Sequence, residues 1–373
     1  MSTPEFRNAC AAALDQAAAR VPQLSAFLGL DGFVDEIIAV VDERQNAKEY
    51  SRIPNISDLA ARIAAAAGRS TNIELVTVRT KLGGNGPIMA NALAAFGLKV
   101  TYLGALGHPA IHPVFEEFCH RADVHSIADP GRTDALEFDD GKLLIGKMFP
   151  LAEVTWENIN RHGKRALVEQ HMASSSLVGF VNWTMLPYMS DIWAAMQSEV
   201  CPKLNGPKRW MFFDLADPEK RPLGERQRAL ELIVGFQKHF ECILGLNEKE
   251  AFEVGQVLGL TGFGHSRPDL QGLTAAIRKN VPVNTVVVHP TRHAMACSDG
   301  TVDDVDGPFV AKPLITTGAG DHFNSGFVLG KLLGLSNAQA LLCGVSTSGF
   351  YVRTGRSPAV SDIAGLMRNW PSA

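Results

Sequence analysis

Short apolar runs alternate with longer stretches of helical periodicity along most of the chain. The apolar runs predict buried strands at residues 24–30, 100–106, 177–183, 209–215, 242–246 and 285–289. The patterns between them predict helices at residues 57–67, 87–96, 114–122, 188–198, 227–239, 248–258 and 270–280. Strands of this kind, separated by helices, are typical of a mostly parallel sheet covered on both faces, so we predict an α/β fold.

Three extended stretches interrupt this alternation. Residues 35–41 and 73–81 read as strands, and residues 133–148 form two apolar runs on either side of Asp139-Asp140-Gly141, which is a good hairpin turn. Hairpin-like strands within an α/β pattern predict a small accessory sheet that stands apart from the main one.

The two ends of the chain are predicted to be helical. Thr3-Pro4-Glu5 provides an N-cap residue, a first-turn proline and an acidic first turn, so we expect a helix from there to about Arg20. The last third changes character and shows two long helical patterns in succession, at residues 319–333 and 337–354.

Composition excludes several classes of protein. The chain has 373 residues, 46% of them hydrophobic, and a net charge of −4, which gives no electrostatic reason to expect nucleic acid binding. The 6 cysteines are scattered without a C-x-x-C pair, which is typical of reduced, buried thiols. No apolar stretch approaches the roughly 18 residues that span a bilayer, and the start of the chain is unlike a signal peptide, so we expect a cytoplasmic location and no membrane partner.

The first candidate functional segment is Gly83-Gly84-Asn85-Gly86-Pro87, at the start of a predicted helix. Its glycines let the backbone approach a ligand closely, and Pro87 suits the first helical turn, whose N–H groups are free. A tight strand-to-helix turn without a ligand is the alternative interpretation. The segment is not G-x-G-x-x-G, so the dinucleotide interpretation is weak.

The second candidate segment is Thr316-Thr317-Gly318-Ala319-Gly320-Asp321, which also begins a helix. Small residues before a helix start form an anion cradle from backbone amides and the positive helix end. A carboxylate at this place is expected to stay ionised and to accept a proton from an attacking hydroxyl. Phosphoryl transfer needs a cradle and a base side by side, although Asp321 as a mere helix cap is the alternative.

These two segments resemble, in the same order, the signature motifs of the ribokinase-like (PfkB) carbohydrate kinases. Three further segments fit the same family, namely Asp31-Gly32-Phe33-Val34-Asp35, Asp214-Leu215-Ala216-Asp217-Pro218 and the N-x-x-E segment Asn247-Glu248-Lys249-Glu250. The resemblance covers nearly the whole chain. It implies a three-layer α/β/α sandwich in one catalytic domain, residues 1–373, with a small β-sheet lid from segments at about 33–45, 72–82 and 133–149.

The resemblance also implies roles for individual residues. Asp321 is implied as the general base, with the amides of Gly318, Ala319 and Gly320 as the anion hole. The implied acceptor-binding residues are Asp31, Asp35, Gly83, Gly84 and Asn85. The implied contacts to ATP are Thr317, Asn247, Glu250, His289 and Thr291, of which Asn247 and Glu250 hold Mg²⁺ through water.

Three departures from the family pattern affect the acceptor and cation ends of the site. Many members have Asn at the position of Ile88, where it contacts the acceptor, and Ile cannot make that hydrogen bond. Many have Asp at the position of Ile315, which leaves activation by a monovalent cation open. The usual Gly-rich turn near the nucleotide is replaced by His289-Pro290-Thr291-Arg292-His293.

We therefore predict an ATP-dependent kinase that phosphorylates a hydroxyl of a sugar or sugar-like molecule. Two alternatives remain open at this point: a nucleoside kinase of the same fold, and a sugar-sensing binding protein without turnover. The intact Asp321 and the pair of Asn247 and Glu250 argue against a sensor, which needs neither. The resemblance also makes a homodimer through the lid an expectation.

Overall fold

The centre of the fold is a 9-stranded sheet in the order β14-β13-β12-β11-β10-β9-β1-β5-β6. The computed structural model describes residues 3–371. The strands are β1 (Ser25–Leu30), β5 (Lys99–Ala105), β6 (Asp123–Ala128), β9 (Leu177–Phe180), β10 (Arg209–Asp214), β11 (Phe240–Leu246), β12 (Thr285–Val288), β13 (His293–Cys297) and β14 (Val302–Asp306). In this spatial order, the strands from β12 to β6 all run parallel to one another. At the other edge β13 pairs antiparallel with β12, and β14 pairs antiparallel with β13.

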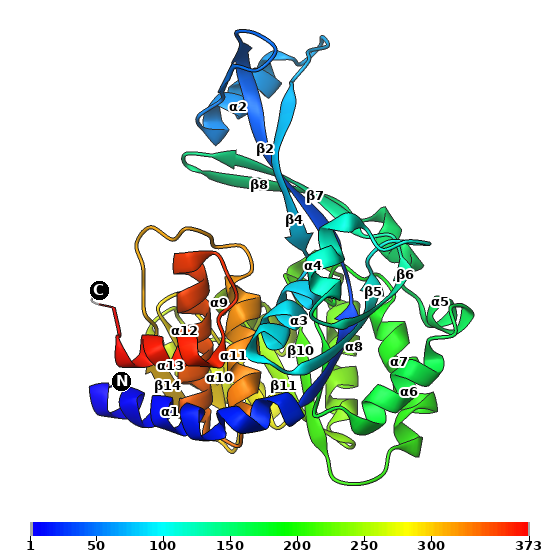
Figure 1. The fold of residues 1–373 in the computed structure, drawn as a ribbon, viewed down its shortest axis with the longest axis vertical. Coiled ribbons are helices and arrows are strands. Elements are labelled where there is room, and N and C mark those ends of the chain that lie inside the picture. Colours follow the sequence, from blue (N-terminus) through cyan, green and yellow to red (C-terminus); the bar gives the residue numbers. More distant parts are fainter. Residues whose placement is uncertain (1–2, 372–373) are drawn as a thin grey trace.

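Helices cover both faces of this sheet, and each face has its own apolar core. One face carries α1 (Pro4–Ala17), α3 (Asn85–Phe96), α4 (Glu116–Cys119), α11 (Ala319–Leu332), α12 (Asn337–Thr354) and α13 (Val360–Arg368). The other carries α5 (Trp156–Arg161), α6 (Arg165–Ser174), α7 (Met189–Glu199), α8 (Leu223–Phe236), α9 (Glu248–Val257) and α10 (Arg267–Asn280). The predicted three-layer α/β/α sandwich is confirmed (Figure 1).

A second, small sheet stands away from the sandwich, at the top of Figure 1. It consists of β2 (Phe33–Arg44), β3 (Tyr50–Arg52), β4 (Leu75–Gly83), β7 (Gly131–Phe138) and β8 (Gly141–Lys147), with α2 (Ile56–Ala65) packed on it. Its apolar cluster, which includes Leu59 of α2 and Leu136 of β7, is separate from the two main cores. The predicted accessory sheet is therefore present, and we call it the small sheet.

The small sheet is joined to the sandwich by a tight corner after β1. There, a Cβ atom on Gly32 would lie 2.0 Å from the carbonyl oxygen of Ala105, so only glycine fits. The corner lets β2 follow β1 almost directly, and β4 returns from the small sheet straight into α3. The two sheets thus meet at the residues that begin β2 and end β4.

Several elements differ from those expected from the sequence. The strand expected at 177–183 ends at Phe180, because Asn182 has a φ of 60° and so leaves the extended conformation. The helix expected at 114–122 is a 3₁₀ turn, Pro113–Phe115, followed by the single turn of α4. His293, expected in a loop, begins β13.

Some elements gave no usable sequence signal at all. The edge strands β6 and β14 carry many polar residues and so lack a continuous apolar run. The strands β3 and β13 and the helices α5, α6 and α13 were also not expected, and most of these are short. At the N-terminus the expected start is confirmed, because Thr3 Oγ1 accepts a hydrogen bond from the Phe6 amide at 3.2 Å. The first helix ends at Ala17 and continues as a 3₁₀ helix, Ala18–Gln23.

Within residues 3–371, every helix is too short or too polar to cross a bilayer.

Candidate active site

Polar residues stand at the carboxyl ends of five neighbouring parallel strands. Asp31 follows β1, Asn182 follows β9, Asp214 ends β10, Asn247 follows β11 and His289 follows β12. The carboxyl ends of parallel strands lie at the same edge of a sheet, and ligands of open α/β sheets bind there. This edge is therefore the candidate active site.

Asp31 is fully buried and holds several groups together. Its carboxylate accepts hydrogen bonds from the Gly86 amide at 2.9 Å, the Tyr102 hydroxyl at 3.2 Å and the Asn182 side chain at 2.7 Å. Burial raises its pKa to about 6, although these hydrogen bonds, that of Asn182 above all, act in the opposite direction. In this structure Asp31 supports the loop before α3 from within, since it has no exposed surface.

The loop before α3 requires glycine because other groups crowd against its backbone. Gly84 is the N-cap of α3 and has a φ of 95°. A Cβ atom on Gly83 would lie 2.4 Å from the Asp35 carboxylate, and one on Gly86 would lie 2.3 Å from the Tyr102 hydroxyl. The packing places Asn85 at the first position of α3, where its side-chain amide donates to Asp321 Oδ1 at 3.0 Å.

Asp321 lies in the first turn of α11 and is 6% exposed. Burial raises its pKa to about 8, and repulsion from Asp31 and Glu250 adds to this, against the hydrogen bond from Asn85. The expectation that the helix start keeps this carboxylate ionised is therefore wrong for the ligand-free protein, because burial outweighs the helix end. A carboxylate with a raised pKa is also a stronger proton acceptor.

The backbone before Asp321 forms a tight, well-anchored loop. Gly318 is the N-cap of α11 with a φ of 89°, and the Ala319 amide donates to the Thr316 carbonyl at 3.1 Å. The Gly320 amide belongs to the first helical turn, where amides have no partner within the helix. From the small sheet, Lys142 Nζ donates to Thr317 Oγ1 at 3.2 Å. The loop thus combines backbone donors with a cation.

A cavity of about 400 Å³ opens beside this loop. Asn247, His289, Thr291, Ala319 and Gly320, which the sequence assigned to the nucleotide and the cradle, all line it. Other walls are apolar, formed by Pro308, Phe309, Phe323, Val345 and Val352. The His289 ring lies 4.6 Å from the Phe323 ring, and burial lowers its pKa to about 4, so the imidazole is neutral. A flat apolar slot next to a helix N-terminus suits a nucleotide.

Asn247 and Glu250 form a reciprocal cap at the start of α9. Asn247 Oδ1 accepts from the Glu250 amide, and Glu250 Oε2 accepts from the Asn247 amide, both at 2.9 Å. Glu250 Oε1 also accepts from the Asp217 amide at 2.9 Å. The sequence assigned both residues to Mg²⁺. In the structure Asn247 lines the cavity beside the Asp321 loop, whereas Glu250 is 4% exposed and both its carboxylate oxygens accept backbone amides.

Glu250 and Asp214 are buried carboxyl groups whose negative charge, once they ionise, the surrounding protein does not balance. Burial raises the pKa of Asp214 to about 7 and that of Glu250 to about 8, and repulsion from Asp321 and Asp214 respectively adds to the effect. Among residues 3–371, their hydrogen-bond partners are amides rather than Lys or Arg. Oxygen ligands with unbalanced negative charge fit a magnesium ion.

A second acidic cluster nearby differs, because its negative charge is balanced by a lysine. Asp217, Glu219 and Glu253 lie close enough to share an ion, but the Lys249 ammonium group pairs with all three. The lysine therefore already supplies the charge that a metal would bring.

The acceptor end of the site is less open than the nucleotide end. Asp35 on β2 is 8% exposed and faces Lys81 on β4, with 4.0 Å between carboxylate and ammonium. Burial raises the pKa of Asp35, whereas the charges of Lys81 and Lys142 and a hydrogen bond from Thr133 lower it. Ile88 packs against the backbone of Gly318, since a Cβ atom built there would lie 3.2 Å from its Cγ2.

Several residues of the site gave little or no signal in the sequence. Asn182 ends a predicted apolar run, and a polar residue at that place could have been marked as a strand-end residue. The sequence could not identify Lys142 as a site residue, because its contact with Thr317 depends on how the small sheet lies over the sandwich. Tyr102 and Asn324 look like ordinary strand and helix residues, yet they hold Asp31 and Asp214 in place.

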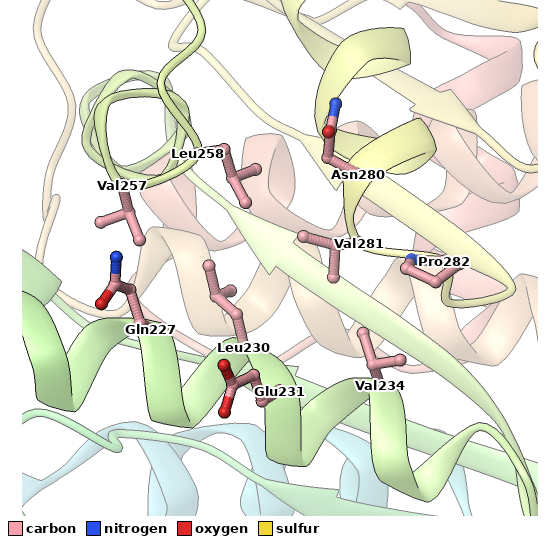
Figure 2. Close-up of a pocket in the computed structure, with 9 residues that line it drawn as sticks. All are labelled: Gln227, Leu230, Glu231, Val234, Val257, Leu258, Asn280, Val281 and Pro282. Atoms are coloured by element: carbon pink, nitrogen blue, oxygen red, sulfur yellow. The ribbon is translucent and has the colours of Figure 1, made fainter.

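A further hollow, shown in Figure 2, lies outside this site. It measures about 540 Å³ and is lined mainly by aliphatic side chains of α8 and of the C-terminal ends of α9 and α10 with the residues that follow them. Glu231 is its only carboxylate among the lining residues of the described chain, and it contains none of the strand-end residues.

Comparison with known proteins shows which family and which fold this chain shares. The family model "Prokaryotic ketohexokinase" matches residues 4–370. A ketohexokinase of Haloferax volcanii is 28% identical over 338 residues, which is 90% of this chain and 88% of that protein. A carbohydrate kinase from Agrobacterium tumefaciens has a TM-score of 0.62 at 17% identity, covering 93% of this chain and 97% of that one. The Arabidopsis thaliana ribokinase, solved with ribose and ATP, has a TM-score of 0.63 at 15% identity, covering 92% and 98%.

The raised pKa of Asp321 predicts a stability effect with a definite sign. Its folded pKa of about 8 lies above the ordinary value of 3.8, so the folded state loses stability as pH rises from about 4 to about 8. Asp321→Asn removes this cost, and we expect its Tm to exceed that of the wild type by a margin that widens over this range. The gain is roughly 1–2 °C for each kcal/mol removed in a chain of this length.

Thermal melts without ATP or Mg²⁺ at several pH values measure this margin. The exposed Asp58→Asn serves as the control for the effect of an Asp-to-Asn substitution itself. Equal melting of Asp321→Asn and wild type at every pH would show that the carboxylate is not strained by burial.

Proposed function

The chain belongs to the prokaryotic ketohexokinase family of carbohydrate kinases, and on this basis we propose that it transfers the γ-phosphoryl group of ATP to a hydroxyl of a ketohexose. The family membership gives the reaction type, sugar phosphorylation. The name of the Haloferax volcanii relative supports the ketohexose as acceptor.

The observation that carries the proposal is the hydrogen bond between Asn85 and Asp321. It joins the glycine loop before α3, which we assign to the acceptor, to the helix start that forms the anion cradle. A base must lie within hydrogen-bond reach of the hydroxyl it deprotonates, and this contact fixes Asp321 at the junction of the two loops. We propose that Asp321 accepts the proton of the attacking hydroxyl.

The charge that develops on the transferred phosphoryl group needs donors on the other side. We assign this role to the amides of Gly318 and Gly320 at the positive end of α11, and to the amide of Ala319 once it exchanges its hydrogen bond to the Thr316 carbonyl for one to the phosphoryl group. ATP would lie in the cavity of about 400 Å³, with its base between the apolar walls near His289 and Thr291 and its phosphates toward Thr317. Preformed donors at the phosphates are the main requirement for this chemistry.

Magnesium would be held at the edge of the site by Asn247 and Glu250, through water, with Asp214 close by. When bound, the ion neutralises charge on the phosphates. The unbalanced carboxylates of Asp214 and Glu250 support this assignment, because a divalent cation would lower their raised pKa values.

The acceptor would lie between the sandwich and the small sheet. We assign its hydroxyls to Asp35 and to the loop of Gly83, Gly84 and Asn85, with Asp31 supporting that loop from behind. Closure of the small sheet over the sugar would exclude water, which otherwise competes as the phosphoryl acceptor.

A substrate panel tests the proposal directly. We expect ATP consumption with fructose or another ketohexose to exceed that with ribose, aldohexoses and nucleosides, and ³¹P NMR of the product identifies the hydroxyl that was phosphorylated. Asp321→Asn is expected to lose about 10²–10⁴-fold in kcat. Preference for a nucleoside, or ligand-induced stabilisation without any turnover, would contradict the proposal.

Lys142 gives a second prediction, since its ammonium group lies on the loop that would bind the phosphates. We expect Lys142→Met to lower kcat about 10²-fold, because one cation at the developing charge is lost. Binding of a non-hydrolysable ATP analogue is expected to weaken more than binding of ADP, as only the former has a γ-phosphate.

The matched control for this change is Lys147→Met on the same strand, β8. Lys147 is exposed and pairs with Asp134 at 2.7 Å, so we expect nearly wild-type kinetics. An unchanged kcat in Lys142→Met, or equal weakening for the analogue and ADP, would exclude Lys142 from the phosphoryl site.

We also propose that the protein forms a homodimer through the small sheet. Among the described strands β8 pairs with β7 alone, so one of its edges is free, and it carries Leu144 and Ile145, which are 59% and 49% exposed. An apolar edge strand favours pairing with a second chain. Light scattering after size exclusion is expected to show a dimer that Ile145→Lys dissociates. Leu223→Lys, at a similarly exposed apolar residue of α8, is expected to leave it intact, and a monomeric wild type would refute the interface.

A further inference from the structure

His322, the residue after Asp321, joins the anion loop to a distant part of the chain. It is 2% exposed, and its Nδ1 lies 2.7 Å from the Gly318 carbonyl oxygen. Its Nε2 lies 2.9 Å from the hydroxyl of Ser357, in the segment between α12 and α13. A single imidazole therefore bridges the N-cap of α11 and the C-terminal segment.

The chemistry of the two partners fixes the form of the ring. A carbonyl oxygen only accepts, so Nδ1 carries the proton and donates it to Gly318. In the neutral ring Nε2 is then an acceptor, and the Ser357 hydroxyl donates to it. Burial lowers the pKa of His322 to about 4, so this neutral tautomer persists throughout the ordinary working range of pH.

Tyr351 of α12 makes the neighbouring contact. Its ring stacks on His322 with 3.6 Å between centroids and 12° between planes, and its hydroxyl donates to the Thr317 carbonyl at 2.9 Å. The carbonyl groups of Thr317 and Gly318 are thus held by adjacent side chains that pack on each other.

Holding these carbonyl groups also orients the amides that follow them. In a trans peptide the C=O and the next N–H point in opposite directions. When Thr317 C=O faces Tyr351, the Gly318 N–H faces away from it, and the same holds for Gly318 C=O and the Ala319 N–H. The contacts behind the loop therefore decide which way its amides point.

Ordinary helix capping does not account for this arrangement. The Gly318 carbonyl already accepts the backbone amide of His322 at 3.1 Å, which is the first hydrogen bond of the helix. The bond from Nδ1 is additional, and the bond to Ser357 ties the loop to a different element. A side chain that served only the helix would need neither.

We propose that His322 is a positioning residue for phosphoryl transfer, and that with Tyr351 and Ser357 it holds the Gly318–Gly320 backbone in the orientation that binds the transferred group. The proposal rests on the proposed function of this loop. It adds a role for three side chains that lie behind the loop.

A second feature makes the role of the imidazole directly testable. His322, Tyr351 and Ser357 line a cavity of about 930 Å³ that also reaches Ile88 and the small sheet. A small molecule can therefore reach the position of the ring from outside when the ring is deleted.

The experiment is chemical rescue of His322→Ala in the full-length chain. We expect kcat with the preferred sugar to fall about 10²-fold, the scale associated with a misplaced catalytic geometry. Added imidazole is expected to restore a large part of kcat, and the restoration should rise with pH as imidazole loses its proton, because the neutral ring is the form required. Unimpaired kcat, or a loss that imidazole leaves unchanged, would overturn the proposal.

His171→Ala is the matched control for imidazole itself. His171 also bonds a serine, Ser175 at 3.1 Å, and stacks on an aromatic ring, Phe27 at 5.3 Å and 19°, but it belongs to α6. We expect it to show no imidazole-dependent gain in kcat. An equal gain in both variants would mean that imidazole acts elsewhere, which would also overturn the proposal.

If His322→Ala does not fold, a second pair of variants still tests the role of His322. In His322→Asn the side-chain amide replaces Nδ1 and can donate to Gly318, whereas His322→Leu has similar size and no donor. We expect the Asn variant to keep much more of kcat than the Leu variant, and Ser357→Ala to lose less than the Leu variant. Equal kcat in Asn and Leu would refute the donor role.

A binding measurement separates this inference from the proposed function. The Leu variant is expected to lose affinity for a non-hydrolysable ATP analogue relative to adenosine, whichever sugar the wild type accepts. A wild type that phosphorylates no ketohexose would contradict the proposed function alone. Unchanged relative affinity in the Leu variant would contradict the positioning role alone.

Discussion

The burial of four carboxyl groups, those of Asp31, Asp214, Glu250 and Asp321, is the constraint on which the rest of the site depends. Burial is the largest cause of the raised pKa of each of these carboxyls, and mutual repulsion adds to it for all but Asp31. Buried charge is costly unless it is paired or hydrogen-bonded. The Asp31 carboxylate is stabilised by hydrogen bonds from Asn182, Gly86 and Tyr102. The other three lack a cationic partner within residues 3–371, so ionising them costs stability that a cation or a proton would restore.

The two sheets contribute different charges to the site. The carboxylates at strand ends and helix starts come from the sandwich, whereas Lys81 and Lys142 come from the small sheet, which also contributes Asp35. Lys142 already contacts the loop of Thr317, and both lysines act on the pKa of Asp35. Attraction between the sandwich carboxylates and these two lysines favours the arrangement in which the small sheet covers the edge. Phosphate groups placed between them would meet the cations of one sheet and, through magnesium, the carboxylates of the other.

The sequence predicted the parts of the molecule that local patterns determine. Central strands such as β10 and β11 are continuous apolar runs, and the glycine segments at Gly83 and Gly318 mark tight turns before helices, so both were found from the sequence. Edge strands such as β14 were missed, because an edge strand carries polar residues. The charge state of Asp321 was also misjudged, since the helix end is visible in the sequence whereas the depth of burial is not. The contacts of Lys142 and His322 join segments far apart in the chain, and no local pattern records them.

At the acceptor end of the site, too, the contacts join segments that are far apart in the chain. Ile88 cannot offer the hydrogen bond that the family pattern places there, and in the structure it packs on Gly318 instead. In the acceptor site that we propose, polar recognition then falls to Asp35, which pairs across the small sheet with Lys81 on one side and Thr133 on the other. Their side chains share one face because the strands are in this register, and a slip by one residue would turn a strand's side chains to the opposite face. With Asp35 as the proposed acceptor-binding residue, acceptor recognition depends on the strand register of the small sheet more than on any motif.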